Sequence, residues 1–175
     1  MPVQVDIIPV GGVDAVVLEK ISAALAMVFP WEMRTGKGIR LPGESYNSRR
    51  RQYNSTAILE TLQALKAGMP GLILGVTDAD LYVPELNFVF GEADMHAGVV
   101  VISLARLKQE FYGLSPDRGL LEERAAKEAT HELGHACGLD HCGSPGCIMY
   151  FSNSIADTDR KGPGFCERCR RILGF

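Results

Sequence analysis

Residues 120–141 read LLEERAAKEATHELGHACGLDH, and this stretch decides what kind of protein the chain encodes. Its first part is rich in Ala, Leu and Glu and contains no proline, which predicts one long helix over 120–137. His131 and His135 are four residues apart, so a helix places both imidazoles on one face, one turn apart. Glu132 directly follows His131 and is therefore displaced by one position on the same helix. The stretch therefore predicts a helix that presents two imidazoles and a carboxylate together.

The histidines of this stretch have the spacing of a metal site. Gly138 can adopt a left-handed conformation and end the helix, so that the chain turns back and brings His141 to the first two histidines. Scattered surface or core histidines are the alternative, but the added Gly and third His favour a metal site over a chance HExxH string. We therefore predict that His131, His135 and His141 bind a catalytic zinc ion with an open position for water, and that Glu132 acts on that water.

Cysteines form a second group of candidate ligands. Cys142 and Cys147 are separated by four residues, and Cys166 and Cys169 by two, which gives the four thiolates of a closed tetrahedral zinc site. Two disulfides or inert buried thiols are the alternatives, and the absence of a secretion signal favours zinc. This second zinc would be structural, because four protein ligands leave no position for substrate, and it would tether the loop that carries the third histidine. Cys137 is predicted to be a small buried residue.

These motifs resemble those of a known family. The pattern HExxHxxGxxH at 131–141 resembles the signature of the metzincin zinc metallopeptidases, and Met149 is similar to their Met-turn methionine. The cysteine after the third histidine, followed by C-x4-C-x-M and CxxC, resembles the archaemetzincin subgroup. The resemblance implies a mixed, mostly parallel twisted sheet above a cleft, an active-site helix beneath it and an irregular C-terminal subdomain. It also implies zinc-dependent peptide hydrolysis.

Two residues near this motif have open roles. Met149 has a soft apolar side chain that suits a floor beneath the histidine ligands, although ordinary packing is the alternative. Tyr150 follows Met149 directly, whereas some metzincins place a tyrosine two residues after the methionine. We therefore assign Tyr150 no catalytic role.

Composition and charge narrow the class of protein. The 175 residues favour one domain over 1–175, and 46% hydrophobic with 22% charged residues is an ordinary globular balance. The net charge of −3 gives no reason to expect a nucleic-acid or membrane partner, and no apolar run approaches the roughly 18 residues of a membrane span. The first residues, MPVQVDIIPV, do not have the form of a signal peptide. We therefore predict a cytoplasmic monomer, with an N-terminal α/β subdomain over 1–138 and a zinc-stabilised C-terminal subdomain over 139–175.

The rest of the chain predicts an α/β fold. Alternating apolar residues over 3–7 predict a strand, and Asp14 is a candidate N-cap for an amphipathic helix that ends before Pro30. Strands that alternate with helices predict a mostly parallel sheet. The short link between 86–90 and 99–103 instead predicts an antiparallel pairing. Further strands are predicted within 31–41, 72–76, 86–90 and 99–103, and a second helix with Ile58, Leu62 and Leu65 on its apolar face.

Two short basic runs complete the inventory of candidate sites. Arg49 to Arg51 predict the solvated start of a helix rather than a nucleic-acid contact. The arginines around Cys169 lie in a predicted short basic helix and are interpreted in the same way.

Two classes of function are consistent with these features. The first is a zinc metallopeptidase that uses a zinc-bound water, activated by Glu132, to hydrolyse a peptide or protein substrate. In it the segment 86–90 would be an edge strand that pairs with the substrate. The second is a non-enzymatic zinc-binding module for a protein or nucleic-acid partner. Glu132 favours the metallopeptidase, because a structural site needs no base beside an open metal position. A peptidase of very narrow specificity would also belong to the first class.

Overall fold

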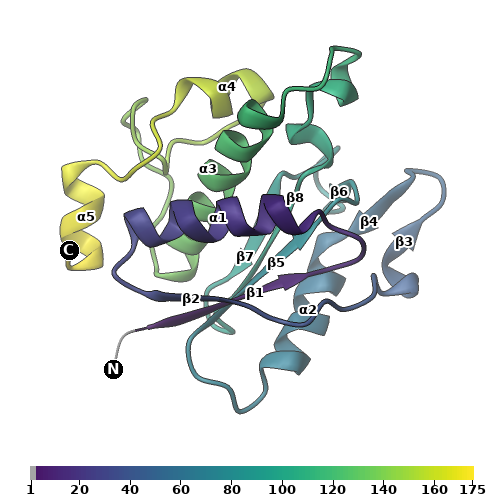
Figure 1. Ribbon diagram of the computed structural model, residues 1–175, viewed down its shortest axis with the longest axis horizontal. Helices are drawn as coiled ribbons and strands as arrows, with labels where there is room; N and C mark the ends of the chain where they lie inside the picture. Colours follow the sequence, from purple (N-terminus) through teal and green to yellow (C-terminus); the bar gives the residue numbers. More distant parts are fainter. Residues whose placement is uncertain (1–2) are drawn as a thin grey trace.

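The structure, a computed structural model, describes residues 3–175; Met1 and Pro2, the first two residues of the predicted domain, lie outside the described part. Its centre is a five-stranded sheet whose strands are, in spatial order, β2 (Glu32–Thr35), β1 (Gln4–Pro9), β5 (Leu72–Thr77), β8 (Val99–Ser103) and β7 (Gly91–Asp94). The first four strands are parallel, and β7 pairs antiparallel with β8 at the edge (Figure 1). The predicted mixed, mostly parallel sheet is confirmed.

Three helices cover the two faces of this sheet: α1 (Ala15–Val28), α2 (Ser55–Lys66) and α3 (Arg118–Ala136). The helices α1 and α3 pack on one face and α2 on the other (Figure 1). The alternation along β1 explains this arrangement, since Val5 and Ile7 pack with α1 and α3 whereas Ile8 packs with α2. The predicted cap of α1 is confirmed, because Asp14 accepts a hydrogen bond of 2.9 Å from the Val16 N–H.

A second sheet was not predicted. Its three strands are β3 (Tyr46–Asn47), β4 (Gln52–Asn54) and β6 (Leu81–Tyr82). Strands of two or three residues are too short to show the alternation from which a strand is predicted. The antiparallel hairpin of β3 and β4 corrects the prediction for Arg49 to Arg51, which form its turn and not the start of a helix. The helix α2 begins only after Asn54, which caps it by accepting a hydrogen bond from the Ala57 N–H.

Two further predictions are corrected by the structure. The segment Leu86–Phe90 is not a strand, since only Val89 forms a β-bridge there, to Leu81. Its apolar residues have other contacts; the Phe88 ring, for example, lies with its centre 4.2 Å from the guanidinium carbon of Arg106. The strand that pairs antiparallel with β8, as predicted, is instead β7, which begins directly after this segment at Gly91. In α2 the buried stripe ends before the last turn, so that Leu65 is 42% exposed and not part of the core.

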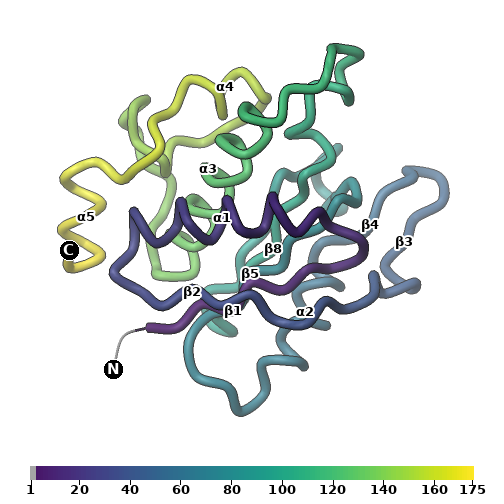
Figure 2. The backbone as a smooth tube through the Cα atoms, viewed as in Figure 1, coloured from purple at the N-terminus to yellow at the C-terminus, as the bar shows by residue number. Residues whose placement is uncertain are grey.

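The chain after α3 is mostly irregular, as the resemblance implied. Figure 2 shows it looping without a helix until α4 (Ile155–Arg160), after which a short linker leads to α5 (Glu167–Leu173). The predicted basic C-terminal helix is α5. Three short 3₁₀ helices complete the structure: η1 (Gly43–Ser45), η2 (Ala105–Leu107) and η3 (Gln109–Tyr112).

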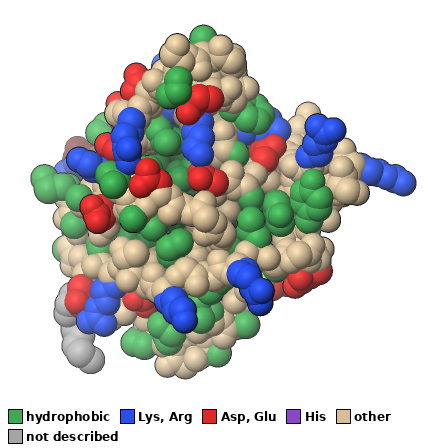
Figure 3. All heavy atoms as spheres, turned by 45° about the vertical axis from the view of Figure 1, so that its right-hand side comes forward, with side chains coloured by type: hydrophobic (Ala, Val, Ile, Leu, Met, Phe, Trp, Pro, Cys, Tyr) green, Lys and Arg blue, Asp and Glu red, His purple; other side chains and the backbone are tan. Residues whose placement is uncertain are grey.

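The surface carries charges of both signs. On the face shown in Figure 3, Lys and Arg side chains are interspersed with Asp, Glu and hydrophobic side chains. None of the helices between residues 3 and 175 combines the length and the apolar composition that a membrane span requires.

Candidate metal centres and active-site cleft

The three histidines of the predicted motif come together at the end of α3. His131 and His135 lie one turn apart, and the chain after the helix returns His141 to them, so that one ring nitrogen of each lies within 4.8 Å of the others. The return depends on Gly138, whose φ of +89° ends the helix in the left-handed conformation that was predicted.

The hydrogen bonds of two rings determine which nitrogen faces the cluster. His131 Nδ1 lies 2.8 Å from the Ile148 carbonyl oxygen, and His135 Nδ1 lies 2.7 Å from that of Leu139. A carbonyl oxygen only accepts, so each Nδ1 carries the ring proton and each Nε2 keeps a lone pair. The two Nε2 atoms are nevertheless 3.1 Å apart, which is repulsive unless a cation lies beside both. With the third histidine, this donor set fits a zinc ion that keeps an open position.

The surroundings favour neutral imidazoles. Burial, and after it the charge of Lys161, lowers the pKa of His131 to about 2. Burial also lowers the pKa of His135 and of His141. The neutral ring is the form that binds a metal, so the cluster is prepared for one at neutral pH.

Met149 lies directly beneath the helix that carries the histidines. Its side chain is fully buried, and a Cβ added to Gly134 would lie only 2.5 Å from Met149 Sδ. Gly134 therefore allows Met149 to approach α3 closely, and the role of Met149 as a floor beneath the histidines stays a prediction. Tyr150, the next residue, is not among the residues that line the cleft.

Glu132 lies in the same cleft as the histidines and is only 6% exposed. Burial raises the pKa of its carboxyl, as do the neighbouring Glu128 and Glu92, whereas Lys161 opposes them. A carboxyl with a raised pKa is suited to exchange a proton near neutral pH. The strand β7 approaches this side chain closely: a Cβ on Gly91 would lie 2.7 Å from Glu132 Cγ and 2.8 Å from its Oε1.

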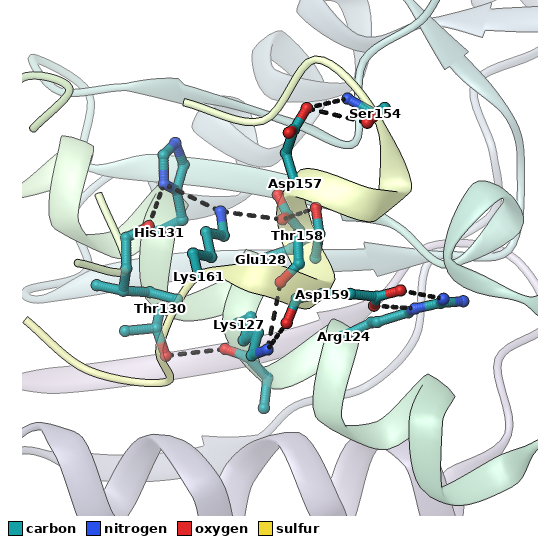
Figure 4. A network of polar contacts seen from close by, with 12 residues as sticks. Arg124, Lys127, Glu128, Thr130, His131, Ser154, Asp157, Thr158, Asp159 and Lys161 are labelled. Carbon is teal, nitrogen blue, oxygen red and sulfur yellow. Dashed lines mark hydrogen bonds and ion pairs between the residues drawn. The ribbon is translucent and has the colours of Figure 1, made fainter. Parts of the chain in front are cut away.

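A buried ion pair lies behind His131, and the sequence did not reveal it (Figure 4). Lys161, whose side chain is 1% exposed, pairs with Glu128 at 3.2 Å, and Thr158 donates to the same carboxylate oxygen at 3.1 Å. Lys161 Nζ also lies 3.5 Å from His131 Nδ1, but both atoms are donors, so this contact is not a hydrogen bond. Glu128 could have been found from its helical spacing of three residues before His131; no local signal marks Lys161.

The same network attaches α4 to α3. Arg124 donates two hydrogen bonds of 2.7 Å to the Asp159 carboxylate, and Lys127 donates to the carbonyl oxygens of Thr158 and Asp159 at 3.2 Å (Figure 4). These bonds fix the end of α4, and with it Lys161, beside the histidines.

The histidines and Glu132 line a cleft of about 400 Å³. Residues 86–91 form one side of it and residues 151–153 another. The Phe151 ring lies 4.8 Å from the His141 ring, and Ser152 Oγ is the one buried side-chain oxygen or nitrogen between residues 3 and 175 that lacks a hydrogen-bond partner. The cleft therefore offers space next to the histidines, with an aromatic ring beside His141.

The four predicted cysteines also cluster. The sulfur atoms of Cys142, Cys147, Cys166 and Cys169 lie within 4.8 Å of one another, and the Cys142–Cys166 and Cys147–Cys169 pairs are both 3.8 Å apart. No disulfide joins them, and a tetrahedral zinc site with bonds of about 2.3 Å would place its sulfurs about 3.8 Å apart. The donor set therefore fits zinc. Cys137 lies apart from this cluster, is half-buried, and has its pKa raised to about 11 by burial.

The fold is similar to that of known structures. The archaemetzincin of Methanopyrus kandleri superposes with a TM-score of 0.88 at 37% identity, over 99% of this chain and 94% of that one. A zinc-dependent peptidase from Methanocorpusculum labreanum superposes with a TM-score of 0.89 at 33% identity, over 97% and 99% of the two chains. Fold and histidine cluster thus place the protein in the class of metzincin zinc metallopeptidases.

The sequence comparisons define the family more narrowly. Residues 29–174 match Peptidase family M54. The archaemetzincin of Methanocaldococcus jannaschii is 43% identical over 173 residues, which cover 99% of this chain and 94% of that protein. The chain belongs to peptidase family M54, the family of the archaemetzincins. The predictions of this family and of a zinc metallopeptidase are confirmed.

Proposed function

We propose that the protein hydrolyses peptide bonds at the histidine cluster, with His131, His135 and His141 as the ligands of a catalytic zinc ion. The observation that carries this proposal is the pair of Nε2 atoms, 3.1 Å apart and beside a cleft, in two rings whose Nδ1 atoms lie next to carbonyl oxygens. Zinc bound there would polarise the scissile carbonyl and lower the pKa of a bound water to about 7.

In this proposal Glu132 is the general base. Its carboxylate accepts a proton from the attacking water and then delivers it to the nitrogen of the leaving amine. Two features support this role: the side chain lies in the cleft directly after a ligand on a rigid helix, and its pKa is raised by burial.

The proposal places the substrate along β7. In an antiparallel pair alternate residues bond to the neighbouring strand, and the Phe90 carbonyl already accepts from Ser103 N–H. Gly91 and Ala93 consequently direct their N–H and C=O groups to the open side of β7. An extended peptide can pair there by β-augmentation, which moves the substrate strand from the predicted segment 86–90 to β7.

The cysteine cluster is proposed to hold a second, structural zinc ion within a C-terminal subdomain of residues 139–175. Cys142 follows His141 directly, so this site would hold the loop that supplies the third histidine. The N-terminal subdomain of residues 1–138 would supply the sheet and α3. The absence of a nucleic-acid partner is proposed as well, and it is supported by the net charge of −3 and the mixed charges of Figure 3; the monomeric state stays a prediction. The cytoplasmic location stays a prediction.

Cleavage of a peptide library by the purified protein tests the proposed reaction. We expect cleavage that a chelator abolishes and that returns when zinc is added. Cleavage that resists the chelator would come from another protease and would contradict the proposal.

The metal content is a separate prediction. Two ligand sets predict two zinc ions per chain, one with nitrogen-rich and one with pure sulfur coordination. Elemental analysis with zinc-edge absorption spectroscopy of the isolated protein measures both. A single zinc ion with only sulfur ligands, or disulfides at the four cysteines, would contradict it.

Gly91→Ala is expected to lower kcat by about tenfold or more with unchanged zinc content, because the new Cβ, which would also lie 2.8 Å from the Val101 carbonyl oxygen of β8, would change the position of the Glu132 carboxylate relative to β7. Gly12→Ala is the matched control, since a Cβ there meets no atom within 4 Å. Steady-state kinetics and elemental analysis of both variants measure this. Equal kcat in the two variants would show that β7 does not position Glu132.

A further inference from the structure

The segment Leu86–Phe90, named here the cleft wall, lines the cleft but belongs to no strand. Backbone carbonyls outside regular structure need other partners, and side chains supply them here. The Leu86 carbonyl accepts a hydrogen bond of 2.9 Å from Arg50 Nη1, and the Asn87 carbonyl accepts one of 3.0 Å from Gln52 Nε2. Both donors come from the β3–β4 hairpin, 36 and 35 residues earlier in the chain.

The donor side of these bonds is itself held in place. Gln52 is 4% exposed and also donates to the Asp80 carboxylate at 3.1 Å. Asp80 forms an ion pair of 2.8 Å with Arg106, whose guanidinium lies 4.2 Å from the centre of the Phe88 ring. Phe88 belongs to the cleft wall. Gln52 is therefore linked to the wall in two ways, by its own hydrogen bond and through Asp80 and Arg106.

We propose that Arg50 and Gln52 are positioning residues for substrate binding, and that the second sheet thereby sets the affinity of the cleft for peptides. The proposal rests on the proposed peptidase function. Neither residue is among those that line the cleft, so the proposed effect acts through the cleft wall. Figure 1 shows the hairpin of β3 and β4 on the side of the molecule away from α5. Loss of the hydrogen bonds that Arg50 and Gln52 donate to the cleft wall should make the wall more mobile and weaken substrate binding. Proton transfer by Glu132 should be unaffected.

Arg50→Ala in the zinc-loaded protein tests this proposal, with Arg49→Ala as the matched control. Arg49 is a neighbouring exposed arginine whose side chain makes no hydrogen bond or ion pair within residues 3–175. We expect Arg50→Ala to raise KM for the best peptide of a quenched fluorescent library about fivefold, with kcat unchanged within about twofold. Amide hydrogen exchange over residues 83–90 should be at least about tenfold faster. Arg50→Lys, which keeps one donating nitrogen, should restore part of the KM and part of the exchange protection. Arg49→Ala should change neither KM nor the exchange rate.

A second variant probes the buried donor. Gln52→Glu keeps the shape of the side chain but replaces the donating nitrogen with an acceptor, so it should accelerate exchange over residues 83–90 as well. Unchanged exchange in Arg50→Ala, or a kcat that falls while KM stays constant, overturns the proposal. The exchange measurement needs no substrate. If the unaltered protein cleaves no library peptide, the proposed function fails, while the exchange rates still decide whether Arg50 and Gln52 hold the wall.

Discussion

Replacing Glu132 with Gln is expected to lower kcat by at least about a hundredfold, which is the usual scale for a positioned general base. The amide has nearly the same shape as the carboxylate, so the close packing against Gly91 is kept and the loss reports the missing proton acceptor. Because Glu132 is not proposed as a ligand, zinc content and melting temperature should stay close to those of the unaltered protein. Steady-state kinetics on a library peptide, elemental analysis and thermal unfolding measure the three quantities.

Asp140→Ala is the control for this variant. Asp140 is the first carboxylate that follows Glu132 in sequence, but it is exposed and lies beyond the Gly138 turn, where helical spacing does not direct it toward the histidines. We expect it to keep most of its turnover. Full loss of turnover in Asp140→Ala, with turnover retained in Glu132→Gln, would assign the base to Asp140. Loss of zinc from Glu132→Gln would instead make Glu132 a ligand.

The parts of the site that lie on one helix could be predicted from the sequence. His131, His135 and Glu132 have relative positions that the helix repeat fixes, and Gly138 marks the helix end by its conformational freedom. The return of His141 required only a short turn after that glycine. Local spacing was therefore enough to predict most of the histidine cluster. The spacing within the two cysteine pairs was enough to predict the second cluster in the same way.

The rest of the cleft could not be predicted, because its order comes from contacts between distant segments. The strand β7 has the sequence GEAD, without an apolar alternation, because Gly91 faces Glu132 while Glu92 accepts hydrogen bonds from Ser55 and Thr56. The apolar segment 86–90 has the alternation of a strand but is held by side chains of a second sheet. Lys161 pairs with a residue of α3 that lies far away in sequence.

Replacing Cys169 with Ser is expected to lower the melting temperature by about 10 °C or more. A structural zinc ion contributes its binding free energy to folding, and a loss of about 4 kcal/mol corresponds to roughly 8–16 °C in a chain of this size. Cys169 is 4% exposed and packs in the main core cluster, so the loosened site would also leave an unpaired hydroxyl in an apolar environment. Thermal unfolding at a fixed zinc concentration measures the effect.

Cys137→Ser is the matched control, since the same sulfur-to-oxygen change is made in a half-buried cysteine outside the cluster. Its melting temperature should fall by no more than a few degrees. Because Cys142 adjoins His141, Cys169→Ser should also lose part of the histidine-bound zinc, so that the total falls below one ion per chain. If Cys169→Ser retains two zinc ions and the melting temperature of the control, the cysteine cluster is not a structural metal site. If it loses one ion but keeps full occupancy at the histidines, the cysteine site stabilises the fold without holding the loop of the third histidine.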